Sequence, residues 1–209
     1  MPVLIALSGL KNSGKTTLAG TLLTLLTERG LSAGYVKHTD RDVLSDSSTD
    51  SGRVTALGMQ ALYWGADGIR MEIPGQIAPE ELQSFFPCFD LVLVEGAKSV
   101  PLPRIWVGPL PSAAEEISGI FAVYDRSASS GDGKFLFTSG EEEALAEQVE
   151  KYAARRGPPD SELYVKRRRI PLKPFIARML AGTLGGLIAP LKGVNWPRKG
   201  AAIFLKGRK

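Results

Sequence analysis

An eight-residue segment near the start of the chain has the residue types and spacing of a phosphate-binding loop. Residues 9–16 read Gly-Leu-Lys-Asn-Ser-Gly-Lys-Thr. Gly9 and Gly14 would let consecutive backbone N–H groups surround phosphate oxygens, while the helix that follows directs its positive dipole end at them. We expect Lys15 to contact the β- and γ-phosphates of a nucleotide and the Thr16 hydroxyl to bind Mg²⁺. The predicted nucleotide-binding residues are Gly9, Lys11, Asn12, Ser13, Gly14, Lys15, Thr16 and Thr17.

A carboxylate that could complete a metal site follows a second apolar run. Residues 90–95 read Asp-Leu-Val-Leu-Val-Glu, as expected for a buried central strand that ends in an acid. At that end Glu95 could hold Mg²⁺ opposite Thr16. An ordinary polar strand end is the alternative. We assign Thr16 and Glu95 as the candidate metal ligands.

A polar segment at residues 39–52 carries two further acids of interest. It contains six serine or threonine side chains, and Asp40 and Asp50 lie near its two ends. Groups that position metal or water often occur in such loops, although both acids could simply belong to loop turns. We take Asp40, together with Lys15, as the candidate catalytic residues.

No motif specifies the nucleobase. The Asn-Lys-x-Asp sequence that selects guanine is absent from the chain. Asp125 ends an apolar run and could accept hydrogen bonds from guanine, but an aspartate that starts a turn before Arg126 is the favoured interpretation. The single histidine, His38, cannot form a triad or a metal cluster; it could contact an anion or simply end a strand.

The elements that would position these residues alternate between strand and helix. Residues 3–8 form a continuous apolar run, residues from Lys15 onward repeat leucine at helical spacing, and residues 34–38 are a short strand. This order predicts parallel pairing with a right-handed crossover, the beginning of an α/β fold. Further strands are expected at residues 60–64, 68–73, 90–95, 104–107, 119–124 and 134–137, and helices at residues 79–86 and 141–155.

Charge divides the chain into two parts. Residues 1–150 carry 11 basic and 20 acidic side chains, a net charge of −9, whereas residues 151–209 carry 15 basic and 2 acidic ones, a net charge of +13. Gly157-Pro158-Pro159-Asp160 has the composition of a linker. We therefore predict a nucleotide-binding domain at residues 1–157 and a small basic module at residues 161–209, with a strand at 163–170, a helix at 175–191 and a strand at 201–205.

Composition indicates a globular protein of the cytoplasm. Hydrophobic residues make up 44% of the 209 residues, which allows a sizeable core, and the single cysteine, Cys88, excludes an intrachain disulfide. The first residues lack the basic start and the cleavage site of a signal peptide.

Four segments together resemble the MobB family of molybdopterin guanine dinucleotide biosynthesis. They are residues 9–17, Val-Lys-His-Thr-Asp at 36–40, Asp-Ser at 50–51, and Leu-Val-Leu-Val-Glu-Gly-Ala-Lys at 91–98. The resemblance implies a P-loop NTPase-like fold, binding of GTP and Mg²⁺, at most weak GTPase activity, and a homodimer. It also implies an accessory role beside the MobA-type guanylyltransferase that joins GMP to molybdopterin, with molybdopterin and molybdoenzymes as further candidate partners. It places Asp40 and Lys98 on positions typical of the family.

Two other functions use the same features differently. A small-molecule kinase would use the same phosphate loop but would need an acceptor site with a lid of arginines, which the stretch after the core strands lacks. A nucleotide-regulated protein could instead bind an anionic partner through the basic run at residues 166–169. Nucleic acid is the disfavoured partner because no aromatic residue lies between these charges.

Overall fold

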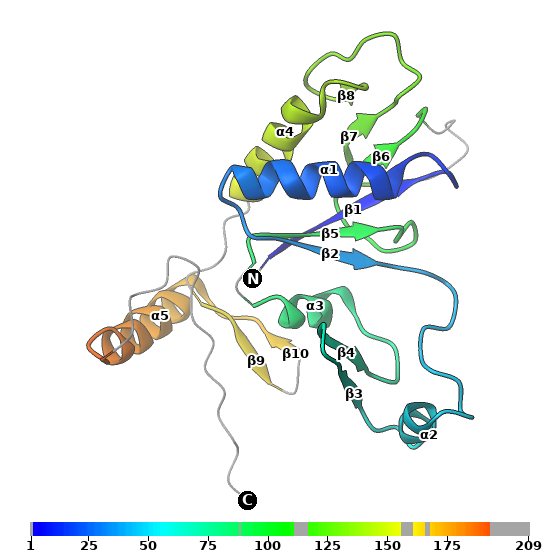
Figure 1. Ribbon diagram of the computed structural model, residues 1–209. Coiled ribbons are helices and arrows are strands. Elements are labelled where there is room, and N and C mark those ends of the chain that lie inside the picture. Colours follow the sequence, from blue (N-terminus) through cyan, green and yellow to red (C-terminus); the bar gives the residue numbers. More distant parts are fainter. Residues whose placement is uncertain (1, 88, 111–116, 156–160, 166–167, 193–209) are drawn as a thin grey trace, which may run out of the picture. The chain divides into compact units, whose positions relative to one another are not determined.

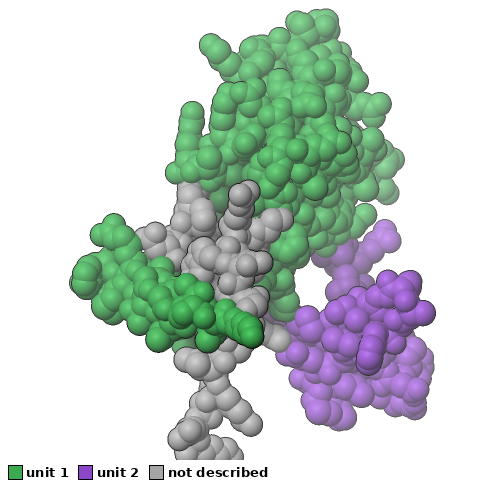
Figure 2. Space-filling view, turned by 60° about the vertical axis from the view of Figure 1, so that its left-hand side comes forward, with its two compact units in different colours: residues 1–38, 79–209 green, residues 39–78 purple. Residues whose placement is uncertain are grey.

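The computed structural model describes residues 2–87, 89–110, 117–155, 161–165 and 168–192. The chain forms two compact units, residues 1–38 with 79–209 and residues 39–78 (Figure 2). The predicted linker and the predicted last strand at 201–205 lie outside the described residues, as does Cys88. The boundary between a main domain and a basic module therefore stays a prediction.

A six-stranded parallel sheet forms the centre of the first unit. Its strand order is β2-β5-β1-β6-β7-β8, and every adjacent pair is parallel (Figure 1). The predicted α/β fold is confirmed. The strands are β1 (Val3–Gly9), β2 (Ala33–Lys37), β5 (Leu91–Glu95), β6 (Arg104–Val107), β7 (Ile120–Tyr124) and β8 (Leu136–Phe137).

Helices cover the sheet because its central strands are apolar on both faces. Helices α1 (Lys15–Glu28) and α4 (Glu142–Arg155) share one hydrophobic core with β1, β5, β6 and β7. A second core on the other face, around Leu4, Val92 and Val94, packs against residues from α3 (Pro79–Leu82) to Phe86, with the short 3-10 helix at Gln83–Phe85 between them. Near-continuous apolar strands are typical of parallel sheets buried in this way.

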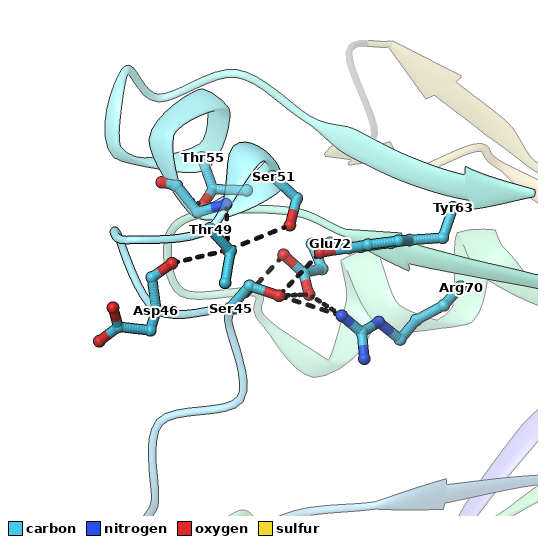
Figure 3. Close-up of polar contacts among 9 residues, drawn as sticks. Ser45, Asp46, Thr49, Ser51, Thr55, Tyr63, Arg70 and Glu72 are labelled. Carbon is cyan, nitrogen blue, oxygen red and sulfur yellow. Dashed lines mark hydrogen bonds and ion pairs between the residues drawn. The ribbon is translucent and has the colours of Figure 1, made fainter.

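The second unit is a β-hairpin joined to a short helix. β3 (Ala61–Trp64) pairs antiparallel with β4 (Ile69–Glu72), which confirms the predicted hairpin. On one side Ser45 Oγ donates to Glu72 Oε1 at 2.7 Å, and Arg70 Nη2 donates to the same oxygen at 2.8 Å (Figure 3). Hydrogen bonds from Ser45 and the charge of Arg70 lower the pKa of the buried Glu72 carboxyl. This network holds the segment that follows β2 to the hairpin.

Two predicted elements differ from the structure. The polar segment at 39–52 contains the start of a helix, α2 (Asp50–Ala56), because the Thr49 hydroxyl caps it by accepting a hydrogen bond from the Gly52 N–H at 3.1 Å. Residues 163–170 form two antiparallel strands, β9 (Leu163–Val165) and β10 (Arg168–Ile170), rather than one. Lys166 and Arg167, which separate these strands in the sequence, include none of the glycine, proline or asparagine residues that usually mark a turn. Helix α5 (Pro174–Ile188) occupies the predicted helical segment.

Candidate functional site

The loop between β1 and α1 has the backbone of an anion-binding turn. Asn12 and Gly14 have positive φ angles, 62° and 92°, while Ser13 between them does not. Alternation of this kind turns successive N–H groups towards one point. Gly9 is required at the start of the loop, because an added Cβ would lie 2.1 Å from the Val107 carbonyl oxygen at the end of β6. The packing of β6 against the loop therefore requires glycine at position 9, where the sequence motif also has glycine.

Lys15 lies at the first position of α1 and points back over the loop. Its Nζ donates hydrogen bonds to the Leu10 carbonyl and to Ser13 Oγ. Burial lowers the pKa of Lys15, and the nearby positive charges of Lys98 and Lys37 lower it further, while Glu95 acts in the opposite direction. A phosphate group would relieve this crowding of ammonium groups.

The two predicted metal ligands come together in the structure. Thr16 Oγ1 donates to Glu95 Oε2 at 2.8 Å, although the residues are 79 positions apart in the chain. The contact arises because β5 lies next to β1, with Glu95 opposite Leu7 in the register. Glu95 is only 7% exposed. A hydroxyl and a carboxylate are the hard oxygen ligands that Mg²⁺ prefers, so this pair fits the ion.

Two residues of β2 complete the surroundings of Glu95. The Tyr35 hydroxyl donates to Glu95 Oε2 at 2.8 Å, and Lys37 Nζ lies 3.7 Å from Oε1. Burial alone would raise the pKa of Glu95, but the hydrogen bonds from Tyr35 and Thr16 and the charges of Lys37 and Lys15 outweigh it and lower that pKa. Burial and the same carboxylate raise the pKa of Tyr35 to about 12. Glu95 is therefore ionised and Tyr35 neutral at neutral pH.

The segment that follows Glu95 bends sharply and packs closely against the backbone of His38. Gly96 and Ala97 both have positive φ angles, 94° and 51°, and a Cβ on Gly96 would lie 2.7 Å from the His38 carbonyl oxygen. This bend carries Lys98, which is exposed and whose Nζ lies 5.2 Å from the ring centroid of Trp106. A backbone held in this conformation at a non-glycine residue needs support from its surroundings.

Arg104 supplies that support. It lies in β6, is 1% exposed, and its guanidinium donates to five acceptors at 2.7–3.5 Å. None of these acceptors is a carboxylate. Burial lowers the pKa of Arg104, and the hydrogen bonds offset the cost of placing its charge in the interior. The acceptors are Ser8 Oγ and the carbonyl oxygens of Ala97, Lys98, Val100 and Ser118.

Tyr35 and Arg104 are parts of the site that were not predicted from the sequence. A charge within the apolar run at 104–107 was a visible signal, because a buried arginine must have partners. Tyr35 gave no such signal, because its role depends on β2 pairing with β5.

The remaining predicted residues lie as follows. Lys11, Asn12 and Thr17 are exposed on the loop and the first turn of α1. Asp40 is exposed and belongs to the unit of residues 39–78, so its catalytic role stays a prediction. Asp50 of the same unit pairs with Arg53 in α2. The backbone N–H of His38 donates to the Glu95 carbonyl at 2.9 Å, as in a strand end.

No group of three or more histidine, cysteine, aspartate or glutamate side chains among the described residues could hold a metal ion by itself. Mg²⁺ does not need such a group, because it usually takes one or two protein ligands together with phosphate and water. In the same part of the chain, no helix is long and apolar enough to cross a membrane.

A glycine-rich loop between the first strand and helix of a parallel sheet, with a lysine, a threonine and an acid on the adjacent strand, defines a P-loop NTPase-like protein. The family model described as "Molybdopterin guanine dinucleotide synthesis protein B" matches residues 4–118, more than half of the chain. The protein therefore belongs to this family, MobB.

Individual relatives agree with this assignment. A Haemophilus influenzae protein named "Molybdopterin-guanine dinucleotide biosynthesis adapter protein" is 30% identical over 133 residues, which cover 58% of this chain and 75% of that protein. The crystal structure of Bacillus subtilis MobB has a TM-score of 0.54 at 22% identity and covers 72% of this chain and 97% of that one. A MobB homologue from Bacillus stearothermophilus has a TM-score of 0.52 at 20% identity, with coverages of 73% and 99%. These structures share the fold.

Proposed function

We propose that this protein binds GTP with Mg²⁺ and acts as an accessory protein in the biosynthesis of molybdopterin guanine dinucleotide. In this role it hydrolyses GTP slowly at most. Its partner is the MobA-type guanylyltransferase that joins GMP to molybdopterin, and it works in the cytoplasm as a homodimer. The name of the Haemophilus influenzae relative, an adapter protein of the same biosynthesis, supports the pathway.

The main support for nucleotide binding is that the side chains of Lys15, Thr16 and Glu95 lie close together at the carboxyl ends of β1 and β5. The charges of Lys37 and Lys98 both act on Lys15, and the Glu95 carboxylate lies close enough to act on it as well. The excess of positive charge favours a polyphosphate over a neutral ligand. Thr16 and Glu95 would hold Mg²⁺, which neutralises phosphate charge when bound.

Each side chain then has a defined task. Lys15 would leave the Leu10 carbonyl and donate to the β- and γ-phosphates, exchanging a neutral acceptor for a charged one. The hydrogen bond from Tyr35 helps to lower the pKa of Glu95 and orients its carboxylate. Arg104 holds the bend that carries Lys98, so this lysine stays beside the phosphate site.

Titration of GTP and ATP against the full-length protein, with and without Mg²⁺, tests the proposal. We expect GTP to bind more tightly than ATP and Mg²⁺ to strengthen binding. Lys15→Ala should weaken GTP binding by about 10- to 100-fold, because it removes charge-assisted hydrogen bonds to phosphate. Lys151→Ala, an exposed lysine of α4, is the control and should bind normally. Wild-type affinity in the Lys15 variant would exclude this site.

Glu95→Gln tests the metal site separately. The substitution keeps the shape and removes the charge, so GTP binding in Mg²⁺ should weaken more than binding without metal. Glu28→Gln, an exposed position at the end of α1, is the matched control. An unchanged dependence on Mg²⁺ would remove Glu95 from the metal site and leave it as an anchor for Thr16.

The adaptor role needs its own measurement. We expect the purified protein to bind a purified MobA-type guanylyltransferase, with an affinity that differs between the GTP-bound and the Lys15→Ala proteins. If no complex forms with GTP, with GDP or without nucleotide, the accessory role is contradicted, whereas the proposal of nucleotide binding is unaffected.

A further inference from the structure

The turn that follows β7 places an arginine on the phosphate loop. Asp125 Oδ1 accepts hydrogen bonds from the Ser127 N–H at 2.9 Å and the Ser127 hydroxyl at 2.6 Å, and the Asp125 N–H donates to the Phe137 carbonyl at 2.8 Å. Asp125 thus builds a tight turn, as favoured from the sequence. The turn fixes Arg126 at the carboxyl edge of the sheet.

Arg126 lies directly over Gly14. A Cβ added to Gly14 would be 3.3 Å from Arg126 Nη1 and 3.6 Å from its Cδ, so both the stem and the guanidinium cover the start of α1. The side chain is exposed. Within the described residues its guanidinium makes no hydrogen bond or ion pair, although its charge acts on the nearby Tyr124 and Glu142. Arg126 is therefore available to a ligand.

The strand order gives the direction in which a nucleotide would lie. Glu95 ends β5, on one side of β1, whereas Arg126 follows β7, on the other side of β1 and beyond β6. Thr16 and Glu95 would hold a metal ion that neutralises charge on the terminal phosphates. The terminal phosphate would then lie on the β5 side, and the α-phosphate, ribose and base would extend over β6 and β7. Arg126 lies at this nucleoside end.

We propose that Arg126 contacts the nucleoside of the bound nucleotide and stacks its guanidinium and stem on the purine. A planar guanidinium packs well on an aromatic face, and its stem adds apolar contact. Nothing has to be broken for this contact, since the guanidinium makes no hydrogen bond or ion pair within the described residues. The inference rests on the proposed binding of a purine nucleotide, and it adds a residue that selects nucleosides over bare polyphosphate.

Two ligands distinguish stacking of Arg126 on the base from a simple attraction of its positive charge to phosphate. GTP and inorganic tripolyphosphate, each with Mg²⁺, are titrated calorimetrically into full-length wild-type, Arg126→Ala and Arg126→Lys proteins. We expect Arg126→Ala to weaken GTP binding about 10-fold and tripolyphosphate binding less than about 2-fold, because stacking concerns the base alone. Arg126→Lys should recover only part of the GTP affinity, because an ammonium cannot stack. Arg178→Ala, an exposed arginine of α5, is the control.

The outcomes are distinct. Equal losses for both ligands would mean that Arg126 binds phosphate, and unchanged GTP binding would mean that it binds no part of the nucleotide; either result overturns the inference while the proposed function stands. A wild-type protein that binds neither ligand overturns the proposed function and this inference with it. The melting temperature of each variant, expected to be that of the wild type, verifies that the fold is intact.

Discussion

Helices α1 and α5 are similar in length but differ in what they bury. Six of the 14 residues of α1 and nine of the 15 residues of α5 are apolar. Yet α1 buries Leu18, Ala19, Leu22 and Leu26, whereas α5 buries only Ala177 among the described residues. Phe175 and Leu187 of α5 are 66% and 64% exposed.

The difference teaches that apolar content does not itself determine burial. Helix α1 follows a strand of the central sheet and packs on that sheet beside α4, which supplies the rest of its core. It is also tied at both ends, by Thr16 to Glu95 and by Arg29 to Glu143 and Glu150 of α4. Helix α5 follows the short hairpin of β9 and β10 instead of a strand of the central sheet. The helix that carries the site is thus the one that the fold holds in place.

The largest effect that we expect is at Leu22. Its side chain is fully buried between α1 and the sheet, so Leu22→Ala should lower the free energy of unfolding by about 2–5 kcal/mol. Urea denaturation followed by circular dichroism measures this loss. A loss below about 1 kcal/mol would show that α1 is not packed more firmly than α5.

A smaller effect concerns the start of α4, where the Tyr124 hydroxyl donates to Glu142. Burial and this carboxylate raise the pKa of Tyr124 to about 12. Because the folded pKa lies above the unfolded value of about 10, the stabilisation is complete below pH 10 and is lost as the pH rises through 12. Tyr124→Phe should cost on the order of 1 kcal/mol at pH 8 and make the alkaline loss smaller.

Denaturation at pH 8, 10 and 11, with tyrosine ionisation followed by absorbance, tests the alkaline prediction. Tyr35 has a similarly raised pKa, so Tyr35→Phe is the matched comparison. Identical alkaline profiles for wild type and Tyr124→Phe would contradict the assigned role of this hydrogen bond.

Deletion of residues 158–209 should have a still smaller effect on stability. Because α5 buries little among the described residues, the melting temperature of residues 1–157 should change by less than about 3 °C, and GTP binding should persist. Differential scanning calorimetry of both chains provides the measurement. A large fall would indicate that the apolar face of α5 is covered in the intact protein, and the contrast with α1 would disappear.

The smallest effect is expected at Leu187. Since its side chain is largely exposed, Leu187→Ala should change the free energy of unfolding by less than about 0.5 kcal/mol. The same urea titration used for Leu22→Ala measures it. A loss close to that of Leu22→Ala would place Leu187 in a core.

Most elements of the fold were predictable from local patterns. The runs that became β1, β5 and β6 are mostly apolar, with charges only at Glu95 and Arg104 at strand ends, and the glycine turn between β3 and β4 was evident. The predicted elements were wrong where a contact that the local sequence pattern does not reveal decides the structure. Helix α2 starts at a threonine cap within a polar loop, and β9 and β10 are divided without a recognisable turn residue.

The candidate site was predictable to the same extent. Lys15, Thr16 and Glu95 could be chosen from spacing and from strand ends, and the structure brings them together. Tyr35 and Arg104 could not, because their partners are set by which strands are neighbours. Asp40 belongs to the other compact unit, so its catalytic role stays a prediction.

The sequence by itself determined the phosphate loop, because Gly9, Gly14, Lys15 and Thr16 are close in the chain and Gly14 readily adopts the positive φ that the loop requires. Only the tertiary structure decided what surrounds that loop. Glu95 reaches Thr16 across 79 residues because β5 lies between β1 and β2, and Arg126 reaches Gly14 because β7 lies on the other side. Such contacts depend on strand order, which is fixed by packing of the whole sheet and not by any one segment.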